Sequence, residues 1–195
     1  MMEHKFVEKD GMGENSVQKG RLYRMTMAAL VTAVTCILAP LALPIGPVPI
    51  SLTNLVLYFS LYLLGWKLGT ISLCVYLLLG AVGLPVFSGF AGGLAKLVGP
   101  TGGYLIGFLP MMILTGIMME KSKKRWVHFL AMVVGTAVCY AFGTMWFCVV
   151  MDSTVGSALM MCVIPFIPGD LIKIVLAVLG GPGICKRLQK AGVLG

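Results

Sequence analysis

The chain has 195 residues, of which 58% are hydrophobic and only 11% are charged, and its mean hydropathy is +0.97. Water-soluble domains carry about 25% charged residues. This composition therefore excludes a water-soluble domain and indicates an integral membrane protein. The formal net charge is +8, but the basic residues stand in short clusters at the ends of apolar stretches. Such clusters are typical of membrane orientation and not of nucleic-acid binding.

The N-terminal segment, residues 1–20, is polar and carries both signs of charge. This segment carries too many charges for a secretory signal, and it places too many residues before the first apolar stretch. Its composition predicts a disordered tail on the cytoplasmic side. The rest of the chain, residues 21–195, is predicted to be a single all-α domain embedded in the membrane.

The apolar stretches that follow predict six membrane-spanning helices, because about 20 helical residues cross the hydrocarbon core. The second and third are separated by the corner at Gly65–Gly69, since one helix through both would be about 50 Å long. Pro165 and Pro168 set the start of the sixth helix, which should end by Gly180-Gly181-Pro182. The predicted spans are residues 25–43, 51–66, 68–84, 103–119, 127–150 and 168–181.

The loops differ in charge between the two sides of the membrane. If the N-terminus is inside, the outer loops hold a single basic residue, Lys96. This asymmetry predicts an even number of spans with both termini in the cytoplasm. The basic residues on the inner side are then Lys19, Arg21, Arg24, Lys67, Lys121, Lys123, Lys124, Arg125, Lys186, Arg187 and Lys190.

The sixth span contains two charged residues, Asp170 and Lys173, near its outer end. An ionisable side chain at the middle of a spanning helix costs roughly 2.5–3.5 kcal/mol. Residues three apart on a helix share a face, so the pair can point together into a hollow that opens to the outside. The alternative is a salt bridge that only fixes the packing of helices.

A glycine-rich segment joins the third and fourth spans, with six glycines between Gly89 and Gly103. Glycine allows close approach of the backbone, and Phe87, Phe90 and Tyr104 flank the segment, so we expect a lid over a ligand. A flexible connector is the alternative. A second outer loop supplies Ser51, Thr53 and Asn54, which could bind a ligand or cap the second helix, and capping is the better interpretation for Ser51.

The chain lacks the residues of an enzyme or an ATPase. Its only histidines are His4 and His128, and no catalytic pair or metal cluster can be assembled at one depth of the membrane. Its six cysteines show no C-x-x-C spacing, and no G-x-x-x-x-G-K-[ST] loop occurs. We therefore predict no catalysis, no metal and no cofactor. A channel remains an alternative, because Thr101–Tyr104 is faintly similar to a filter loop.

These segments together resemble the BioY family, the biotin-specific S components of energy-coupling-factor transporters. The resemblance covers the membrane region from Ala28 to about Gly181. The chain departs from the family after Ile50, where Ser51-Leu-Thr53 replaces the usual Thr-Leu-Gln, and Asn54 is expected to supply the amide. The matching motifs are Gly46-Pro-Val-Pro-Ile50, Gly83-Leu-Pro-Val-Phe87, Gly99-Pro-Thr-Gly-Gly-Tyr-Leu105 and Pro168-Gly-Asp-Leu-Ile-Lys173.

The resemblance implies a six-helix subunit that captures biotin from outside, in the plasma membrane of a prokaryote. Transport would then require a transmembrane coupling protein, facing Ala29 and Ala33 on the first helix, and two ABC-type ATPases. An S component for another small vitamin is the main alternative. The predicted biotin site consists of Asp170, Lys173, Tyr104, Asn54, Phe87, Phe90 and Thr101.

Overall fold

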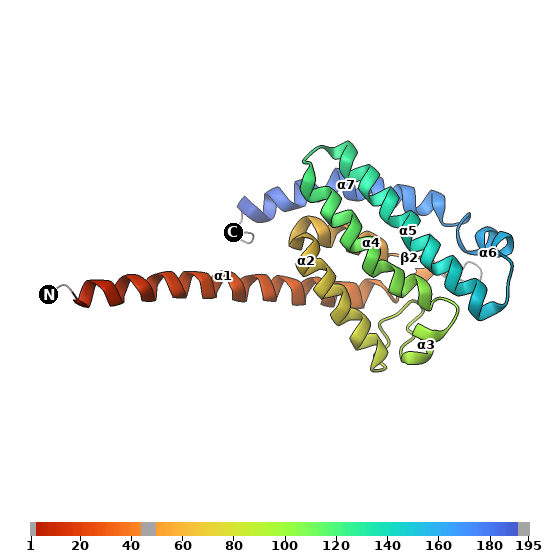
Figure 1. Ribbon diagram of the computed structural model, residues 1–195, viewed down its shortest axis with the longest axis horizontal. Coiled ribbons are helices and arrows are strands. Elements are labelled where there is room, and N and C mark those ends of the chain that lie inside the picture. The colour runs from red at the N-terminus through yellow and green to blue at the C-terminus, as the bar shows by residue number, and fades with distance from the viewer. Residues whose placement is uncertain (1–2, 44–49, 191–195) are drawn as a thin grey trace.

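The computed structural model describes residues 3–43 and 50–190. These residues form a helical bundle with one short two-stranded sheet (Figure 1). In chain order the elements are α1 (Glu3–Leu38), β1 (Ala42–Leu43), β2 (Ile50–Ser51), α2 (Thr53–Ala81), α3 (Leu94–Val98), α4 (Gly102–Lys121), α5 (Arg125–Met151), α6 (Val155–Cys162) and α7 (Ile167–Lys190).

Helix α1 has other bounds than the first predicted span. It begins at Glu3, and the half formed by residues 3–20 extends away from the other helices (Figure 1). No proline interrupts this segment, so its polar composition does not forbid a helix. At the other end α1 stops at Leu38 and not at Leu43, because Pro40 disfavours helical backbone in the residue before it. Residues 44–49, which include most of the Gly46–Ile50 motif, lie outside the described residues.

Helix α2 contains the break that the sequence predicts between the second and third spans. Gly65 has φ 71° and ψ 177°, a backbone conformation outside the helical region that glycine adopts without steric cost. The break divides α2 into residues 53–64 and 66–81. The first part is about 18 Å long and the second about 24 Å.

The last helices begin close to their predicted positions. Helices α4 and α5 exceed the fourth and fifth predicted spans by one or two residues at each end. The short helix α6 was not predicted, because eight residues are too few for a span. Helix α7 passes Gly180-Gly181-Pro182, its predicted end, and continues to Lys190. A proline removes one backbone hydrogen bond and usually kinks or breaks a helix. Helix α7 nevertheless continues through Pro182.

Helices α4 and α5 form the most extensive helix pair. Glycines allow this close approach: a Cβ atom added to Gly103 would lie 2.2 Å from the Cβ atom of Trp146, and one added to Gly143 would lie 2.2 Å from the ring of Tyr104. Small residues at such crossings let two helices pack closely in lipid. The pairing fixes Tyr104 in the interior of the bundle.

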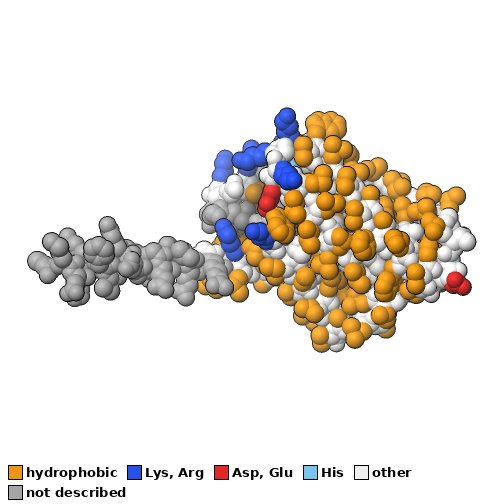
Figure 2. Space-filling view, viewed as in Figure 1, with side chains coloured by type: hydrophobic (Ala, Val, Ile, Leu, Met, Phe, Trp, Pro, Cys, Tyr) orange, Lys and Arg blue, Asp and Glu red, His pale blue; other side chains and the backbone are white. Residues whose placement is uncertain are grey.

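Among the described residues, four helices are long and apolar enough to cross a membrane, namely α2, α4, α5 and α7, and α1 contains a shorter apolar stretch at Leu22–Leu38. Hydrophobic side chains cover most of the face seen in Figure 2, while lysine and arginine side chains gather at one end. This end carries the exposed basic residues of the α4–α5 turn and of the end of α7. The chain is therefore a multi-pass membrane protein.

Gly80 tests the packing of the glycine-rich segment against α2. A Cβ atom at Gly80 would lie 2.1 Å from Cζ of Phe87, which is fully buried. We expect Gly80→Ala to lower the thermal unfolding midpoint in detergent, because overpacking costs about 1–3 kcal/mol. Gly156→Ala in α6 is the matched control, since no atom lies within 4 Å of its added Cβ. Equal midpoints for the two variants would contradict this packing.

Candidate ligand site

A small polar hollow lies where several helix ends meet. Its walls come from the start of α2, the glycine-rich segment, the start of α4, the middle of α5, the end of α6 and the start of α7. Its volume is about 70 Å³. The residues that line it are Ser51, Thr53, Asn54, Ser88, Thr101, Tyr104, Leu105, Phe108, Met111, Thr136, Cys139, Tyr140, Cys162, Phe166, Asp170 and Lys173.

The buried ion pair that the sequence predicts lies in this hollow. Nζ of Lys173 lies 2.9 Å from Oδ1 of Asp170, and the two residues are only 7% and 5% exposed. Asp170 lies in the first turn of α7, where the helix dipole favours a negative charge. The spacing of three residues places both side chains on one face of α7, as expected.

Two further acceptors bind the ammonium group of Lys173. The backbone carbonyl of Ser51 lies 2.8 Å from Nζ, and Oδ1 of Asn54 lies 3.4 Å from it. A lysine ammonium has three N–H donors, so Lys173 is fully hydrogen-bonded without a ligand. These contacts join the start of α7 to the end of β2 and the first turn of α2.

Asp170 is held from a second side by α5. The hydroxyl of Tyr140 donates a hydrogen bond of 2.5 Å to Oδ2 of Asp170. One turn earlier on α5, Thr136 bonds to the hydroxyl of Tyr58 and to the carbonyl of Met132. A carboxylate has about four lone-pair positions on its two oxygens. Asp170 uses two of them, so it can still accept hydrogen bonds from a ligand.

The chemistry of the hollow is that of binding. The carboxylate has free acceptor positions for the N–H groups of a compact ligand, and Lys173 can donate to a carbonyl oxygen beside them in place of one of its present acceptors. Burial raises the pKa of the Cys162 thiol in α6, so this thiol stays protonated and is a poor nucleophile. In the described part of the chain, no three His, Cys, Asp or Glu residues lie close enough together to hold a metal ion.

Comparisons with known proteins identify the family of the chain. The sequence profile described as "BioY family" matches residues 12–190. The chain belongs to the BioY family. It is 38% identical to the "Biotin transporter BioY" of Thermotoga maritima over 87% of this chain and 98% of that protein. It is 34% identical to the "Biotin transporter BioY2" of Lactococcus lactis over 89% and 96% of the two chains.

A solved structure supports the same grouping. The S-component for biotin from an ECF-type ABC transporter superposes with a TM-score of 0.78 at 35% sequence identity, covering 87% of this chain and 92% of that one. The resemblance to the BioY family is thus confirmed, and the helical fold matches that of an S component.

Within this BioY fold, five of the seven predicted site residues come together. Tyr104, Asn54 and Thr101 line the hollow together with the Asp170–Lys173 pair. The hydroxyl of Tyr104 lies 3.4 Å from Oγ1 of Thr144 and 3.5 Å from the carbonyl oxygen of Cys162. Its ring therefore has a fixed position in the wall of the hollow.

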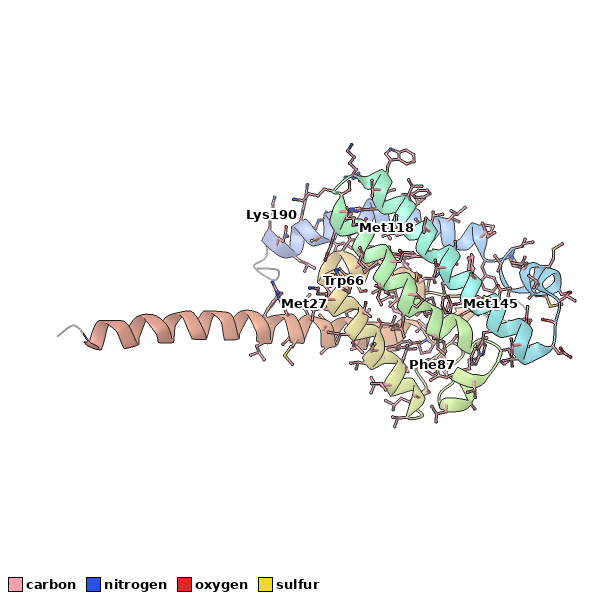
Figure 3. All side chains as sticks on the ribbon, in the orientation of Figure 1. Met27, Trp66, Phe87, Met118, Met145 and Lys190 are labelled. Atoms are coloured by element: carbon pink, nitrogen blue, oxygen red, sulfur yellow. The ribbon has the colours of Figure 1, made fainter. Side chains whose placement is uncertain are left out.

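The other two predicted residues, Phe87 and Phe90, do not line the hollow. Phe87 is fully buried and packs edge-on against Tyr76 with ring centroids 5.6 Å apart, away from the Lys190 end of the bundle (Figure 3). Phe90 is 64% exposed and has a positive φ of 57°. In the structure Phe87 anchors the glycine-rich segment in the core, and Phe90 lies on the surface.

Several residues of the hollow were not predicted from the sequence. Tyr140, Thr136 and Ser88 were not predicted, because a lone hydroxyl in an apolar helix or loop gives no sign of the direction it faces. Ser51 was interpreted as a helix cap. Leu52 holds the N-cap position of α2, but the Ser51 hydroxyl accepts a hydrogen bond of 3.4 Å from the backbone N–H of Thr53, the first residue of α2. Ser51 also offers its carbonyl oxygen to Lys173.

Three other residues singled out in the sequence lie elsewhere. Ala29 and Ala33 are exposed on α1 and line a separate, larger groove between α1 and α2. Lys96 lies in α3, is half-buried and does not line the hollow.

The buried ion pair should affect the thermal stability of the protein in the absence of ligand. Lys173→Met leaves a buried carboxylate without its cation, which costs about 3–5 kcal/mol, whereas replacing a whole buried pair with apolar residues is often neutral. We therefore expect Lys173→Met to lower the thermal midpoint strongly and Asp170→Leu/Lys173→Met to recover most of the loss. A double variant as unstable as the single one would show that the carboxylate is not the cause.

Proposed function

We propose that this chain is the biotin-binding membrane subunit of a vitamin uptake transporter, and not an enzyme. The observation that carries the proposal is the buried Asp170–Lys173 pair, which lies in a polar hollow with unused acceptor capacity on the carboxylate. Biotin is the ligand named for the related proteins of the BioY family, and its functional groups complement this hollow.

The ureido ring of biotin has two N–H donors beside one carbonyl acceptor. We assign the N–H groups to the free lone pairs of Asp170 and the ureido oxygen to Lys173. The oxygen would replace Asn54, whose contact with Nζ is the longest of the three at 3.4 Å. Charge-assisted hydrogen bonds in a dry site are strong, and they penalise ligands that leave a partner unpaired.

The apolar parts of biotin require an apolar surface next to the pair. Tyr104, Phe108, Met111 and Phe166 line the hollow and would hold the thioether ring and the valeryl chain. Thr101 begins the same stretch of α4 and supplies a hydroxyl close to them. This arrangement gives the predicted residues Tyr104 and Thr101 a role in the walls of the site.

The hollow must widen when biotin enters. Its 70 Å³ is well below the roughly 300–1000 Å³ of sites that hold compounds of this size. The glycine-rich segment contributes Ser88 to the wall, and Gly89 and Gly93 within it have positive φ values. We propose that this segment moves outward to admit biotin and closes again behind it.

The helices support six crossings with both termini in the cytoplasm. The crossings are the Leu22–Leu38 stretch of α1, the two parts of α2 on either side of Gly65, and α4, α5 and α7. The first part of α2 is short, and we assign the remaining depth to the short strand β2 directly before it. Non-helical backbone at membrane depth occurs where it lines a cavity, and Ser51 of β2 lines the hollow.

Active uptake requires partners, because the sequence has no nucleotide-binding loop. We propose that a transmembrane coupling protein and two ABC-type ATPase subunits supply the energy, in the plasma membrane of a prokaryote. A related structure comes from an ECF-type ABC transporter. Ala29 and Ala33 are exposed on α1 at a spacing that lets a partner helix approach closely, so we assign the coupling-protein contact to them.

Calorimetric titration of the detergent-purified protein with biotin tests the proposed site. We expect tight binding by the wild-type protein and its loss in both Asp170→Asn and Lys173→Ala, because each change removes a charged partner of the ureido ring. Asp152→Asn and Lys123→Ala are matched controls, since both residues are exposed and lie outside the hollow. Both controls should bind biotin as the wild-type protein does.

Wild-type affinity in Asp170→Asn and Lys173→Ala would remove the site assignment. Titration with several unrelated vitamins tests the main alternative, an S component for another ligand. Tight binding of one of those vitamins, with weak binding of biotin, would replace the proposed ligand and leave the fold unchanged.

Cysteine labelling in intact cells tests the six-span topology. In a variant without native cysteines, an impermeant maleimide should label Ser157→Cys, in α6 on the outer side. It should label Lys123→Cys, in the α4–α5 turn, only after the membrane is permeabilised. Both residues are exposed in the structure. Labelling of Lys123→Cys in intact cells would contradict the orientation.

A further inference from the structure

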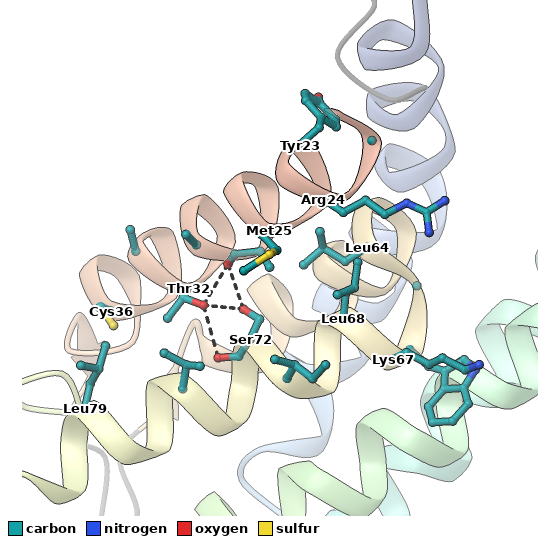
Figure 4. Close-up of a pocket in the computed structure, with 18 of the residues that line it drawn as sticks. Tyr23, Arg24, Met25, Thr32, Cys36, Leu64, Lys67, Leu68, Ser72 and Leu79 are labelled. Carbon is teal, nitrogen blue, oxygen red and sulfur yellow. Dashed lines mark hydrogen bonds between the residues drawn. The ribbon is translucent and has the colours of Figure 1, made fainter. Parts of the chain in front are cut away.

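A groove of about 1490 Å³ runs between α1 and the second part of α2 (Figure 4). On α1 it extends from Gly20 to Cys36, which is a length of about 24 Å. Half of the hydrocarbon core is about 15 Å thick, so the groove is long enough for an acyl chain of one leaflet. Several of its residues, including Ala29, Ala33 and Ile71, are exposed and would face lipid.

The middle of the groove offers no free polar group. Thr32 of α1 and Ser72 of α2 line it, and their hydroxyl oxygens lie 2.8 Å apart. The same hydroxyls also lie within hydrogen-bond distance of the carbonyl oxygens of Ala28 and Ser72, as the dashed lines of Figure 4 show. Because these groups bond to one another, the middle of the groove suits a hydrocarbon chain.

The end of the groove that we place at the inner surface is polar and has a net positive charge. Arg24 of α1 and Lys67 of α2 line it, with Glu120 as the single acid. Among the side chains that the structure describes, no carboxylate lies within 4.0 Å of either cation. Nζ of Lys67 lies 5.5 Å from the centroid of the Trp66 ring. Tryptophan and basic residues together mark the headgroup region.

A hydroxyl at the same end lacks a partner. The Tyr23 side chain also lines the groove, and its oxygen atom is buried with no hydrogen-bond partner among the described residues. Buried hydroxyls usually bind a polar atom. A phosphate or ester oxygen of a lipid would satisfy this one.

We propose that the groove binds one anionic phospholipid of the inner leaflet, with its phosphate between Arg24 and Lys67 and an acyl chain along Ala29, Thr32 and Ala33. Two cations and one carboxylate leave a net charge of +1, which complements a singly charged phosphodiester. The proposal rests on the inside-facing orientation proposed above but not on biotin. Because Ala29 and Ala33 lie in the groove, the lipid would compete with the coupling protein for this surface.

Native mass spectrometry of the purified protein tests the proposal, with equimolar phosphatidylglycerol and phosphatidylcholine of identical acyl chains as the probes. We expect the wild-type protein to retain phosphatidylglycerol preferentially. Arg24→Gln/Lys67→Gln should reduce this preference at least about fivefold, since each basic residue near an anionic headgroup contributes about 1 kcal/mol. Ala33→Leu, which narrows the groove, should reduce the binding of both lipids and keep the preference.

The matched control is Arg187→Gln/Lys190→Gln, which removes the same charge from the end of α7, outside the groove. It should bind both lipids as the wild-type protein does, and circular dichroism should show that every variant is folded. The absence of any headgroup preference in the wild-type protein would overturn the proposal and leave the groove to a protein helix. An equal loss of preference in the control would overturn it too, since general surface charge would then explain the selectivity. A biotin titration of the same samples reports separately on the proposed function.

Discussion

The buried pair of Asp170 and Lys173 constrains the rest of the fold. Two opposite charges inside an apolar bundle are stable only when their hydrogen-bonding capacity is met. Three elements meet this requirement: β2 through the carbonyl of Ser51, α2 through Asn54, and α5 through Tyr140. The positions of these elements around the start of α7 follow from this need. The same contacts explain why a polar hollow forms at the ends of helices that are otherwise apolar.

The packing of the remaining helices holds this arrangement in place. Gly143 gives room to the ring of Tyr104, so α4 and α5 approach closely and present Tyr104 and Tyr140 to one hollow. Phe87 fills the space above Gly80 and fastens the glycine-rich segment to α2. The segment is thus anchored at one point, while Ser88, the residue after Phe87, reaches the wall of the hollow. Because Phe87 fixes the glycine-rich segment at one point and glycines follow it, the rest of the segment is suited to open and close over the hollow.

The sequence predicts the features that depend on local chemistry. Hydropathy locates the apolar helices, the glycine at position 65 locates the break in α2, and the spacing of Asp170 and Lys173 places both on one helix face. It does not predict contacts between distant segments. Tyr140 is 30 residues from Asp170, and nothing in the sequence around it shows which way its ring faces. Phe87 and Phe90 stand in the same glycine-rich segment, yet one is buried and the other exposed, because tertiary packing decides their positions.

We propose that the ion pair of Asp170 and Lys173 binds the ureido ring of biotin. The most direct test is a crystal structure of the protein with biotin bound. We expect a ureido nitrogen within about 2.7–3.2 Å of the Asp170 carboxylate. Lys173 should bind the ureido oxygen, and Asn54 should have moved away from Nζ. A structure in which biotin lies elsewhere, while Lys173 keeps its contacts with Ser51, Asn54 and Asp170, would contradict this proposal.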